Sequence, residues 1–509
     1  MTDLAEPLHR PFPRARSKDD IVRLVPIHVV WEITLACNLK CQHCGSRAGH
    51  VRSNELSTAE CLDLVDQMAA LGTREITLIG GEAYLRRDWL DIVRRIKSHG
   101  ILCLIQSGAR NLNDLRLTQA KEAGLDGLGI SIDGLQALHD RVRGVPGSWA
   151  QAISALERAR ALGFTTSVNT QIGAETLPHL APLMDRIIEA GARHWQIQLT
   201  VAMGNAVDNP ELLLQPHRLI ELMPELARLY REGAKRGMTM VVGNNIGYFG
   251  PYERLWRGFG DERVHWGGCA AGQNVIGIEA DGTIKGCPSL ATVGYAAGNI
   301  RDLTLEDIWD NTEAMAFGRT RSVEADLWGY CRQCYYADVC RAGCTWTSHS
   351  LLGRRGNNPY CHFRVRDLAR KGLRERVVKI KEAPPDSFAV GEFALIEEPI
   401  PEAERAALGD IFPAQSPNDG RPVHIAPEDR PVAEGGRIPP GLVLCRSCHE
   451  YIWPHETDCP HCGADVAKAA EEYEARLVRV QELAAAIRQR LDGLPAVERD
   501  LVSEIPHSS

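Results

Sequence analysis

Short apolar segments alternate with longer amphipathic ones over the first half of the chain. Apolar runs rich in β-branched residues predict strands at 28–35, 75–79, 101–106, 127–132, 165–171, 194–199 and 238–242. Between them lie helical patterns with readable starts, such as Ser57 with Glu60 as a capping box, and Ser148 ahead of 149–162. Repeated units of this kind predict parallel strands covered by helices. We therefore expect an α/β fold, a partial (β/α)6 TIM-like barrel over 28–244, with its functional residues at the C-terminal ends of the strands.

The pattern changes after residue 244. A bridging segment over 245–268 leads into 269–381, where helices become scarce, cysteines become frequent, and a hairpin is predicted around Asp281-Gly282. Sequence rich in Pro, Glu and Ala over 382–440 predicts a linker. A cysteine module then spans 441–466, a charged helix and tail span 467–509, and a polar lead spans 1–27.

Composition and charge narrow the possible functions. The chain has 509 residues and a net charge of −8, which does not suit a nucleic-acid surface. No apolar run approaches the roughly 20 residues that cross a bilayer, and the start lacks the apolar stretch of a signal peptide, so we expect a cytoplasmic protein. Because the cytosol keeps thiols reduced, the sixteen cysteines predict metal sites. Cys61 and Cys103, which stand alone, are expected to be buried small side chains.

The first cysteine group directly follows the first predicted strand. Cys37, Cys41 and Cys44 have the spacing C-x3-C-x2-C. Three thiolates on one short loop can hold three irons of a cubane 4Fe-4S cluster, which leaves the fourth iron open to chemistry. A zinc site, in which His43 would turn inward as the fourth ligand, is the alternative.

A glycine-rich turn, Gly80-Gly81-Glu82, follows the second predicted strand. With the cysteine loop, this turn makes the chain resemble the radical S-adenosylmethionine (SAM) superfamily. The resemblance implies that SAM chelates the open iron and that an electron from the cluster cleaves the carbon–sulfur bond of SAM. The 5′-deoxyadenosyl radical that results would then abstract hydrogen from the substrate. It also implies that the turn hydrogen-bonds the methionine ammonium, with glycine allowing the backbone to approach the ligand. Ala83 stands where the family usually has proline.

Polar residues at other predicted strand ends fit the same cofactor. The resemblance implies further SAM contacts from Ser107, Ser131, Asp133, Arg143 and Asn169. Arg143 resembles the family's segment near the methionine carboxylate, for which a guanidinium fork is suited. The alternative for each residue is a strand-end side chain that bonds its own backbone.

The second cysteine group comprises Cys269, Cys287, Cys331, Cys334, Cys340, Cys344 and Cys361. Its order resembles the SPASM domain, the auxiliary-cluster module of many peptide-modifying radical enzymes. The resemblance implies one auxiliary 4Fe-4S cluster on Cys269, Cys287 and Cys344, and another on Cys331, Cys334, Cys340 and Cys361. The first set lacks a fourth cysteine, so either His265 or another side chain completes it, or that iron is open to substrate or solvent. Two structural zinc sites are the alternative.

The third cysteine group consists of two facing knuckles, Cys445-x2-Cys448 and Cys459-x2-Cys462. This spacing predicts a closed, tetrahedral, structural zinc site of the ribbon type, with a rubredoxin-like iron site as the alternative. So small a module cannot fold on apolar burial, so metal binding is expected to supply its stability. Its position suggests docking or the handling of a precursor peptide.

Two auxiliary clusters fused to the barrel imply, by the same resemblance, a peptide substrate. We expect a maturase of a ribosomally made precursor peptide, of the Nif11 type, that forms a crosslink, rearranges the chain or excises backbone. Its expected cofactors are SAM, three 4Fe-4S clusters and one Zn²⁺, with electrons from flavodoxin or ferredoxin. Only 27 residues precede the first strand, so we expect either a separate leader-binding protein or recognition of the leader through the C-terminal region. The alternatives are a small-molecule enzyme acting on a tetrapyrrole or cofactor precursor, and a sulfatase-maturase-like protein oxidase.

Overall fold

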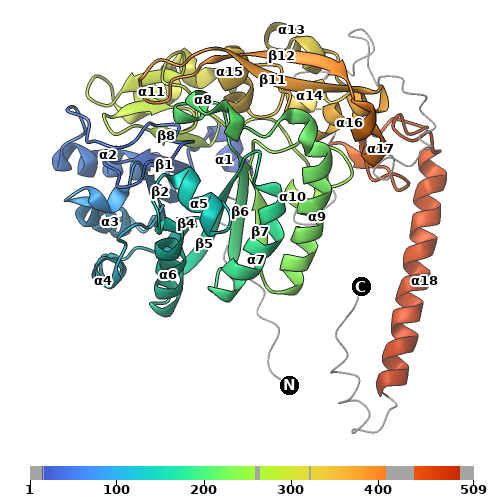
Figure 1. Cartoon of the computed structure of the whole chain (residues 1–509), viewed down its shortest axis with the longest axis horizontal. Coiled ribbons are helices and arrows are strands. Elements are labelled where there is room, and N and C mark those ends of the chain that lie inside the picture. Colours follow the sequence, from blue (N-terminus) through green and yellow to red (C-terminus); the bar gives the residue numbers. More distant parts are fainter. Residues whose placement is uncertain (1–13, 15–16, 258–263, 320–321, 409–440, 493–509) are drawn as a thin grey trace.

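The computed structural model describes the chain except for residues 1–13, 15–16, 258–263, 320–321, 409–440 and 493–509. Helices cover the outside of a curved sheet, and the long helix α18 (Val466–Asp492) extends away from the rest of the molecule (Figure 1). Among the described helices, none combines the length and apolar character needed to cross a membrane.

Seven parallel strands form the centre of the molecule in chain order. They are β1 (His28–Glu32), β2 (Glu75–Ile79), β3 (Leu102–Ser107), β4 (Gly127–Ser131), β5 (Thr165–Ile172), β6 (His194–Leu199) and β7 (Thr239–Val242). Each strand pairs with the next, so all seven C-terminal ends lie along one edge. The predicted partial barrel is confirmed, and this edge positions the candidate site.

Helices connect these strands, as the amphipathic patterns predicted. They are α2 (Thr58–Ala70), α3 (Trp89–Ser98), α4 (Asp114–Glu122), α5 (Gln136–Arg143), α6 (Ser148–Ala161), α7 (Leu180–Glu189), α8 (Asn205–Asp208) and α9 (Leu219–Lys235). Ser57 and Glu60 form the predicted capping box at α2. Ser148 is not a cap, because Gly147 occupies the N-cap position of α6 and the Ser148 hydroxyl donates to Asp140 instead.

Shorter helices flank these elements and build most of the region after the barrel. They are α1 (Lys18–Arg23), η1 (Ala83–Leu85), η2 (Leu177–His179), η3 (Pro210–Leu212), η4 (Pro216–Arg218), α10 (Glu253–Arg257), α11 (Leu305–Asn311), α12 (Glu313–Ala316), α13 (Val323–Asp326), η5 (Gly329–Arg332), α14 (Ala337–Cys340), α15 (Thr345–Leu352) and α16 (His362–Arg370). Most span only one or two turns, so this region depends on packing and on its cysteines for stability.

The cysteine-rich region shares the sheet of the barrel. β8 (Val275–Ile278) and β9 (Thr283–Lys285) form the predicted hairpin, and β10 (Ala296–Asn299) pairs antiparallel with β9. β8 also pairs parallel with β1, so the two regions form one ten-stranded sheet. The sequence did not predict this pairing, which covers an edge of β1 that would otherwise leave its backbone groups unpaired.

The linker predicted from residue 382 is wrong for 382–408. β11 (Leu373–Lys381) and β12 (Glu392–Pro399) form an antiparallel pair, and α17 (Glu402–Leu408) follows. Cross-strand ion pairs support the pairing, because Arg374 and Arg376 contact Glu398 at 2.7 and 2.8 Å. The rest of the predicted linker, 409–440, lies outside the described residues.

Buried residues fill the space between the sheet and its helices. Cys61 and Cys103 are completely buried within this core, as predicted. Glu32, the last residue of β1, is also buried, with its Oε1 atom 3.7 Å from Nη2 of Arg52. Burial raises the pKa of Glu32 to about 8, against the lowering effect of Arg52. At neutral pH this carboxyl group therefore holds a proton in the folded chain.

We expect Glu32 to make stability depend on pH. The folded chain holds this proton more tightly than the unfolded chain, so the stabilisation is complete below the ordinary pKa of 4.5 and is lost as pH rises through about 8. The variant Glu32→Gln should remove this part of the slope, while Glu122→Gln on an exposed helix surface should keep it. Urea unfolding at a series of pH values measures both, and equal slopes in the two variants would contradict this assignment.

Candidate active site and the cysteine groups

Hydrogen-bond donors lie at all three thiols of the loop that follows β1, two from the loop itself and one from α5. The backbone N–H groups of Leu39 and Ala48 donate to the Sγ atoms of Cys37 and Cys44, both at 3.4 Å. Nη1 of Arg143 lies 3.7 Å from Sγ of Cys41. Such donors favour the thiolate form, which is the form that binds metal.

Burial opposes ionisation of these thiols when no metal is bound. It raises the pKa of Cys37 to about 12, with a further contribution from Glu82, and that of Cys41 to about 11, against the lowering effect of Arg143. A bound metal deprotonates a coordinating thiol outright. Three thiols on one loop, with a donor at each sulfur, therefore fit the iron–sulfur cluster that the spacing predicts.

The Gly80-Gly81-Glu82 turn lies against the start of this cysteine loop. The N–H groups of Gly81 and Glu82 donate to the carbonyls of Thr34 and Ala36 at 2.9 and 2.8 Å. A Cβ atom on Gly80 would come within 2.1 Å of the Thr34 oxygen, and one on Gly81 within 2.1 Å of the Ala36 oxygen. In this structure, the chain's own backbone already requires glycine at both positions, whereas we expected the approach of a ligand to require it.

We expect Gly81→Ala to damage the site severely. Its Cβ atom would meet backbone rather than a side chain that can move, so the turn and the cysteine loop must separate at a cost of about 1–3 kcal/mol or more. Gly49→Ala is the matched control in the same region, because a Cβ atom there meets nothing within 4 Å. Thermal unfolding and iron content compare the two, and a stable Gly81→Ala protein with full iron would contradict the steric argument.

The Glu82 side chain is bound within the protein. It is 1% exposed and accepts hydrogen bonds from the Ser107 hydroxyl at 2.5 Å and from the Gly108 N–H at 2.7 Å. Burial raises the pKa of Glu82 to about 7, partly offset by the hydrogen bond from Ser107. Ser107 and Glu82 thus form one unit, which joins the ends of β2 and β3.

A second buried unit is centred on Asp133, just after β4. Its carboxylate accepts from Nε of Arg143 at 2.7 Å and from the Gln171 N–H at 2.9 Å, and Nε2 of His43 lies 3.0 Å away. Despite its burial, Asp133 has its pKa held well below the usual range by Arg143 and His43. Because His43 faces this carboxylate, this geometry gives no support to His43 as a zinc ligand. Arg143 links Asp133 to Cys41, which positions the cysteine loop over the sheet.

A third unit joins polar side chains of three neighbouring strands. Nε2 of Gln106 donates to Oγ of Ser131 at 3.0 Å, and Nδ2 of Asn169 donates to Oε1 of Gln106 at 2.7 Å. The strand-end pattern of the sequence indicates Ser131 and Asn169 but not Gln106, which connects them. The sequence does contain a sign of this role, because a glutamine near the end of an otherwise apolar strand indicates that a hydrogen-bond partner lies beside it.

The seven cysteines of the second group, between residues 269 and 361, gather into a set of three and a set of four. Burial raises the pKa of Cys344 to about 12, and the nearby thiols of Cys269 and Cys287 add to the effect. Four others, Cys331, Cys334, Cys340 and Cys361, line one cavity. Backbone N–H groups of Asn358 and Tyr336 donate to Cys331 and Cys334 at 3.4 and 3.5 Å. A cavity lined by four thiols that accept such donors fits a metal cluster.

One contact between the barrel edge and the set of three was missed by the sequence analysis. Phe388, in the connection between β11 and β12, is 8% exposed and donates its N–H to the carbonyl of Gly45 at 3.0 Å. Nζ of Lys285 lies 3.8 Å from the centre of the Phe388 ring, and Cys287 packs in the same apolar cluster. The segment expected to be a linker thus reaches the cysteine loop that follows β1.

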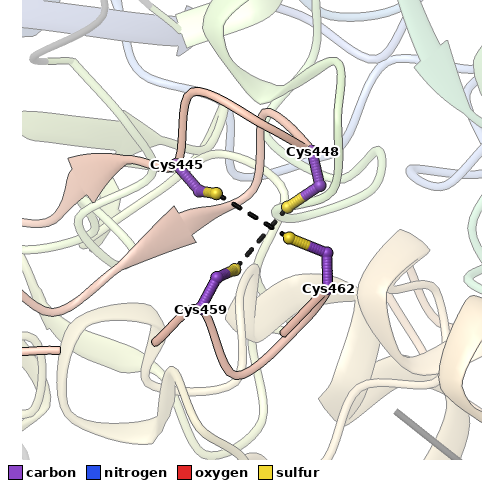
Figure 2. Close-up of side chains that lie close together, drawn as sticks. All are labelled: Cys445, Cys448, Cys459 and Cys462. Atoms are coloured by element: carbon purple, nitrogen blue, oxygen red, sulfur yellow. Dashed lines mark hydrogen bonds between the residues drawn. The ribbon is translucent and has the colours of Figure 1, made fainter. Parts of the chain in front are cut away.

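The four C-terminal cysteines converge on one point (Figure 2). All four Sγ atoms lie within 4.8 Å of one another, with Cys445 and Cys462 3.9 Å apart and Cys448 and Cys459 3.7 Å apart. The strands β13 (Val443–Leu444) and β14 (Tyr451–Ile452) hold the first knuckle. Four converging thiols suit a tetrahedral metal site of the zinc type.

Comparisons with known proteins agree with the geometry. Residues 31–187 match the profile of the radical SAM superfamily, and residues 269–335 match that of an iron–sulfur cluster-binding domain, SPASM. An AdoMet-dependent heme synthase of Oleidesulfovibrio alaskensis is 28% identical over 66% of this chain and 87% of its own length. Mycofactocin maturase MftC of Mycobacterium ulcerans is 29% identical over 63% of this chain and 83% of its own length.

Solved structures share the fold at lower identity. Streptococcus suis SuiB bound to S-adenosylmethionine superposes with a TM-score of 0.52 at 15% identity, covering 66% of this chain and 76% of that chain. The enzyme anSMEcpe with bound AdoMet gives 0.53 at 17% identity, covering 66% and 94%. The barrel and its cysteine loop therefore define an enzyme that uses SAM and iron–sulfur chemistry. The chain therefore contains a radical SAM region over residues 31–187 and a SPASM region over residues 269–335.

Proposed function

We propose that this enzyme modifies a ribosomally made precursor peptide. The observation that carries the proposal is the division of the SPASM-region cysteines into a set of three and a set of four, in addition to the three on the barrel. The mycofactocin maturases among its relatives support peptide maturation. SuiB has also been solved with its precursor peptide SuiA, which supports a peptide partner at the level of a shared fold.

In this proposal Cys37, Cys41 and Cys44 hold the catalytic cluster. When bound there, the cluster and SAM together supply the 5′-deoxyadenosyl radical that abstracts hydrogen from substrate. Arg143 donates to Cys41 and is held by Asp133, so it orients the loop. The backbone of the Gly80-Gly81-Glu82 turn and the linked side chains of Gln106, Ser131 and Asn169 bind and orient SAM.

The set of three thiols is one ligand short of the four that hold a 4Fe-4S cluster. Nδ1 of His265 lies 3.0 Å from the Trp266 carbonyl, and the His265 ring packs against Tyr451 rather than standing free. We propose that the auxiliary cluster on Cys269, Cys287 and Cys344 takes a substrate group or solvent at its remaining iron. Electron paramagnetic resonance spectra of that cluster should change when the peptide is added, and unchanged spectra would count against substrate ligation.

We propose the cofactors, partners and location that the sequence predicts. The enzyme holds two auxiliary clusters, and Zn²⁺ binds to the four C-terminal cysteines. It takes electrons from flavodoxin or ferredoxin, and a separate protein binds the leader of its precursor peptide. It works in the cytoplasm, where thiols stay reduced.

Co-expression with a short open reading frame next to its gene tests the function. We expect the peptide to change mass, by loss of hydrogen or of a backbone fragment, and to remain unmodified when Cys37, Cys41 and Cys44 are replaced. Mass spectrometry with fragmentation identifies the residue changed. An unmodified peptide beside an enzyme that cleaves SAM would contradict the proposal for that peptide.

A small-molecule substrate is the second candidate, because several relatives are named for tetrapyrrole chemistry. They include the AdoMet-dependent heme synthases at 25–28% identity and an Fe-coproporphyrin III synthase at 26%. Incubating the reconstituted enzyme anaerobically with SAM, reductant and Fe-coproporphyrin III distinguishes the two candidates. Substrate-dependent 5′-deoxyadenosine with conversion of the porphyrin would favour this second function over the first.

A further inference from the structure

The C-terminal module, residues 443–466, packs on the wall of the four-cysteine cavity. Phe249, Tyr336 and Phe363 line that cavity and also belong to an apolar cluster with Tyr451 and Trp453 of the module. The same aromatic side chains therefore contact the space between the thiols on one side and the module on the other. Tyr451 and Trp453 are 0% and 1% exposed, which shows that the contact is close.

Two adjacent tyrosines fix the module in place. Tyr336 stacks on Phe249 with ring centroids 3.8 Å apart, donates its hydroxyl to the Tyr451 carbonyl at 2.7 Å, and lies 3.0 Å from Nε2 of His461. The Tyr335 hydroxyl donates to Glu456 at 2.9 Å and accepts from the Trp453 N–H at 2.9 Å. Both tyrosine hydroxyls are therefore paired across the contact, as buried polar groups normally are.

These tyrosines are also part of the cavity's cysteine loop. They directly follow Cys334, and the Tyr336 N–H donates to the Cys334 thiol at 3.5 Å. His461 stands between Cys459 and Cys462 in the second knuckle. A path of two residues, His461 and Tyr336, therefore links the C-terminal metal site to a thiol of the cavity.

A buried ion pair makes a second connection. Arg366, on the helix that follows Cys361, pairs with Glu450, which is 2% exposed. The Glu450 carbonyl accepts the Cys445 N–H at 2.9 Å, so the pair is attached to the first knuckle. Removing one partner of a buried ion pair is strongly destabilising. The position of the module therefore depends on the first knuckle being folded, because that knuckle holds Glu450.

The fold of the module depends on its four thiols. Its two strands have two residues each, and each knuckle turns through a left-handed residue, His449 at φ 61° and Gly463 at φ 71°. Its own apolar cluster consists of the four cysteines with Ile452 and Val466. So small a cluster contributes little apolar burial, so the free energy of metal binding becomes the module's free energy of folding. Loss of the metal would therefore loosen every contact that the module makes with Tyr335, Tyr336 and Arg366.

We propose that Zn²⁺ on Cys445, Cys448, Cys459 and Cys462 locks the module as a cover over the cavity lined by Cys331, Cys334, Cys340 and Cys361. This inference rests on the proposed function in one respect, namely that an iron–sulfur cluster occupies that cavity. The stability and potential of such a cluster depend on its exposure to solvent. The zinc site then shields one auxiliary cluster from solvent, and this role is separate from the chemistry on the barrel.

A double variant that cannot hold zinc tests the cover. Cys448→Ser with Cys462→Ser replaces the two less buried thiols, and Ser447→Ala, exposed in the same knuckle, is the matched control. We expect the double variant to lose its zinc, to exchange backbone hydrogens faster over 330–363, and to release auxiliary iron to a chelator several-fold faster. The control should behave as wild type in all three measurements.

Tyr336→Phe tests the contact without touching a thiol. It retains the ring that stacks on Phe249 but removes the hydroxyl that bonds Tyr451 and His461. We expect this variant to keep its zinc and yet to exchange hydrogens faster over 330–363, with a smaller increase in iron release. This variant keeps the test decisive even where the double variant folds poorly.

The readouts separate this inference from the proposed function. None requires SAM cleavage or a peptide. A wild-type protein that holds auxiliary iron but no zinc, or equal iron release with and without zinc, would overturn the cover. A wild-type protein without auxiliary iron would overturn the proposed cluster, while hydrogen exchange would still report whether zinc holds the module in place.

Discussion

Replacing Cys37, Cys41 and Cys44 together with alanine should abolish the formation of 5′-deoxyadenosine. These thiols lie on one loop, each with a hydrogen-bond donor at its sulfur, and we expect no other group to replace them as ligands. Anaerobic reconstitution should give about twelve irons per wild-type chain and about eight in the variant, because each 4Fe-4S cluster contributes about four. Iron analysis and chromatography of the reaction mixture measure both effects.

A lone cysteine provides the control for this experiment. Cys61 is fully buried against the barrel and belongs to none of the cysteine groups, so Cys61→Ala should retain full iron and turnover. Turnover that survives in the triple variant would end the assignment of the loop as the catalytic site. Wild-type protein that binds only zinc after anaerobic reconstitution would do the same.

Asp133→Ala should destabilise the barrel and weaken SAM binding together. The substitution leaves the Arg143 guanidinium buried without its carboxylate, which costs about 3–5 kcal/mol. Because Arg143 also donates to Cys41, its displacement should disturb the cysteine loop. Urea unfolding gives the loss of stability, and calorimetric titration of the reconstituted enzyme with SAM gives the loss of affinity.

A double-mutant cycle decides whether this ion pair accounts for the effect. Asp133→Ala leaves the charge of Arg143 buried without a partner, and Arg143→Met removes that charge. The double variant should therefore lose less stability than the two single variants lose in sum. Arg141→Met is the matched control, since Arg141 pairs with Glu175 on the surface, where ion pairs contribute little. Additive losses for Asp133 and Arg143 would show that the two residues act independently.

Local patterns predicted a large part of this fold. The apolar runs located the seven strands of the barrel, the Asp281-Gly282 turn located the hairpin, and Ser57 with Glu60 located the start of a helix. Cysteine spacing was equally informative, because ligands of one metal site often stand close together on a loop. These features need only neighbours in sequence, so a single chain displays them.

Long-range features escaped the sequence analysis. The pairing of β8 with β1 joins residues about 250 positions apart, and nothing local marks it. β12 contains an apolar run at 393–396, yet its acidic and proline-containing surroundings favoured a linker, and only its pairing with β11 identifies it as a strand. Gln106 is unusual near the end of an apolar strand, but its partners Ser131 and Asn169 stand on other strands, and only the fold brings them beside it.

The sequence by itself determined the class of chemistry, because three thiols on one loop and a glycine turn after the next strand require only short spacings. Only the tertiary structure decided why Gly80 and Gly81 must lack a side chain, since the clashing oxygens belong to Thr34 and Ala36. It also placed the C-terminal module on the four-cysteine cavity, through contacts with Tyr335 and Tyr336 that lie more than 100 residues away in sequence. Such contacts depend on how separate elements pack, and packing is a property of the whole chain.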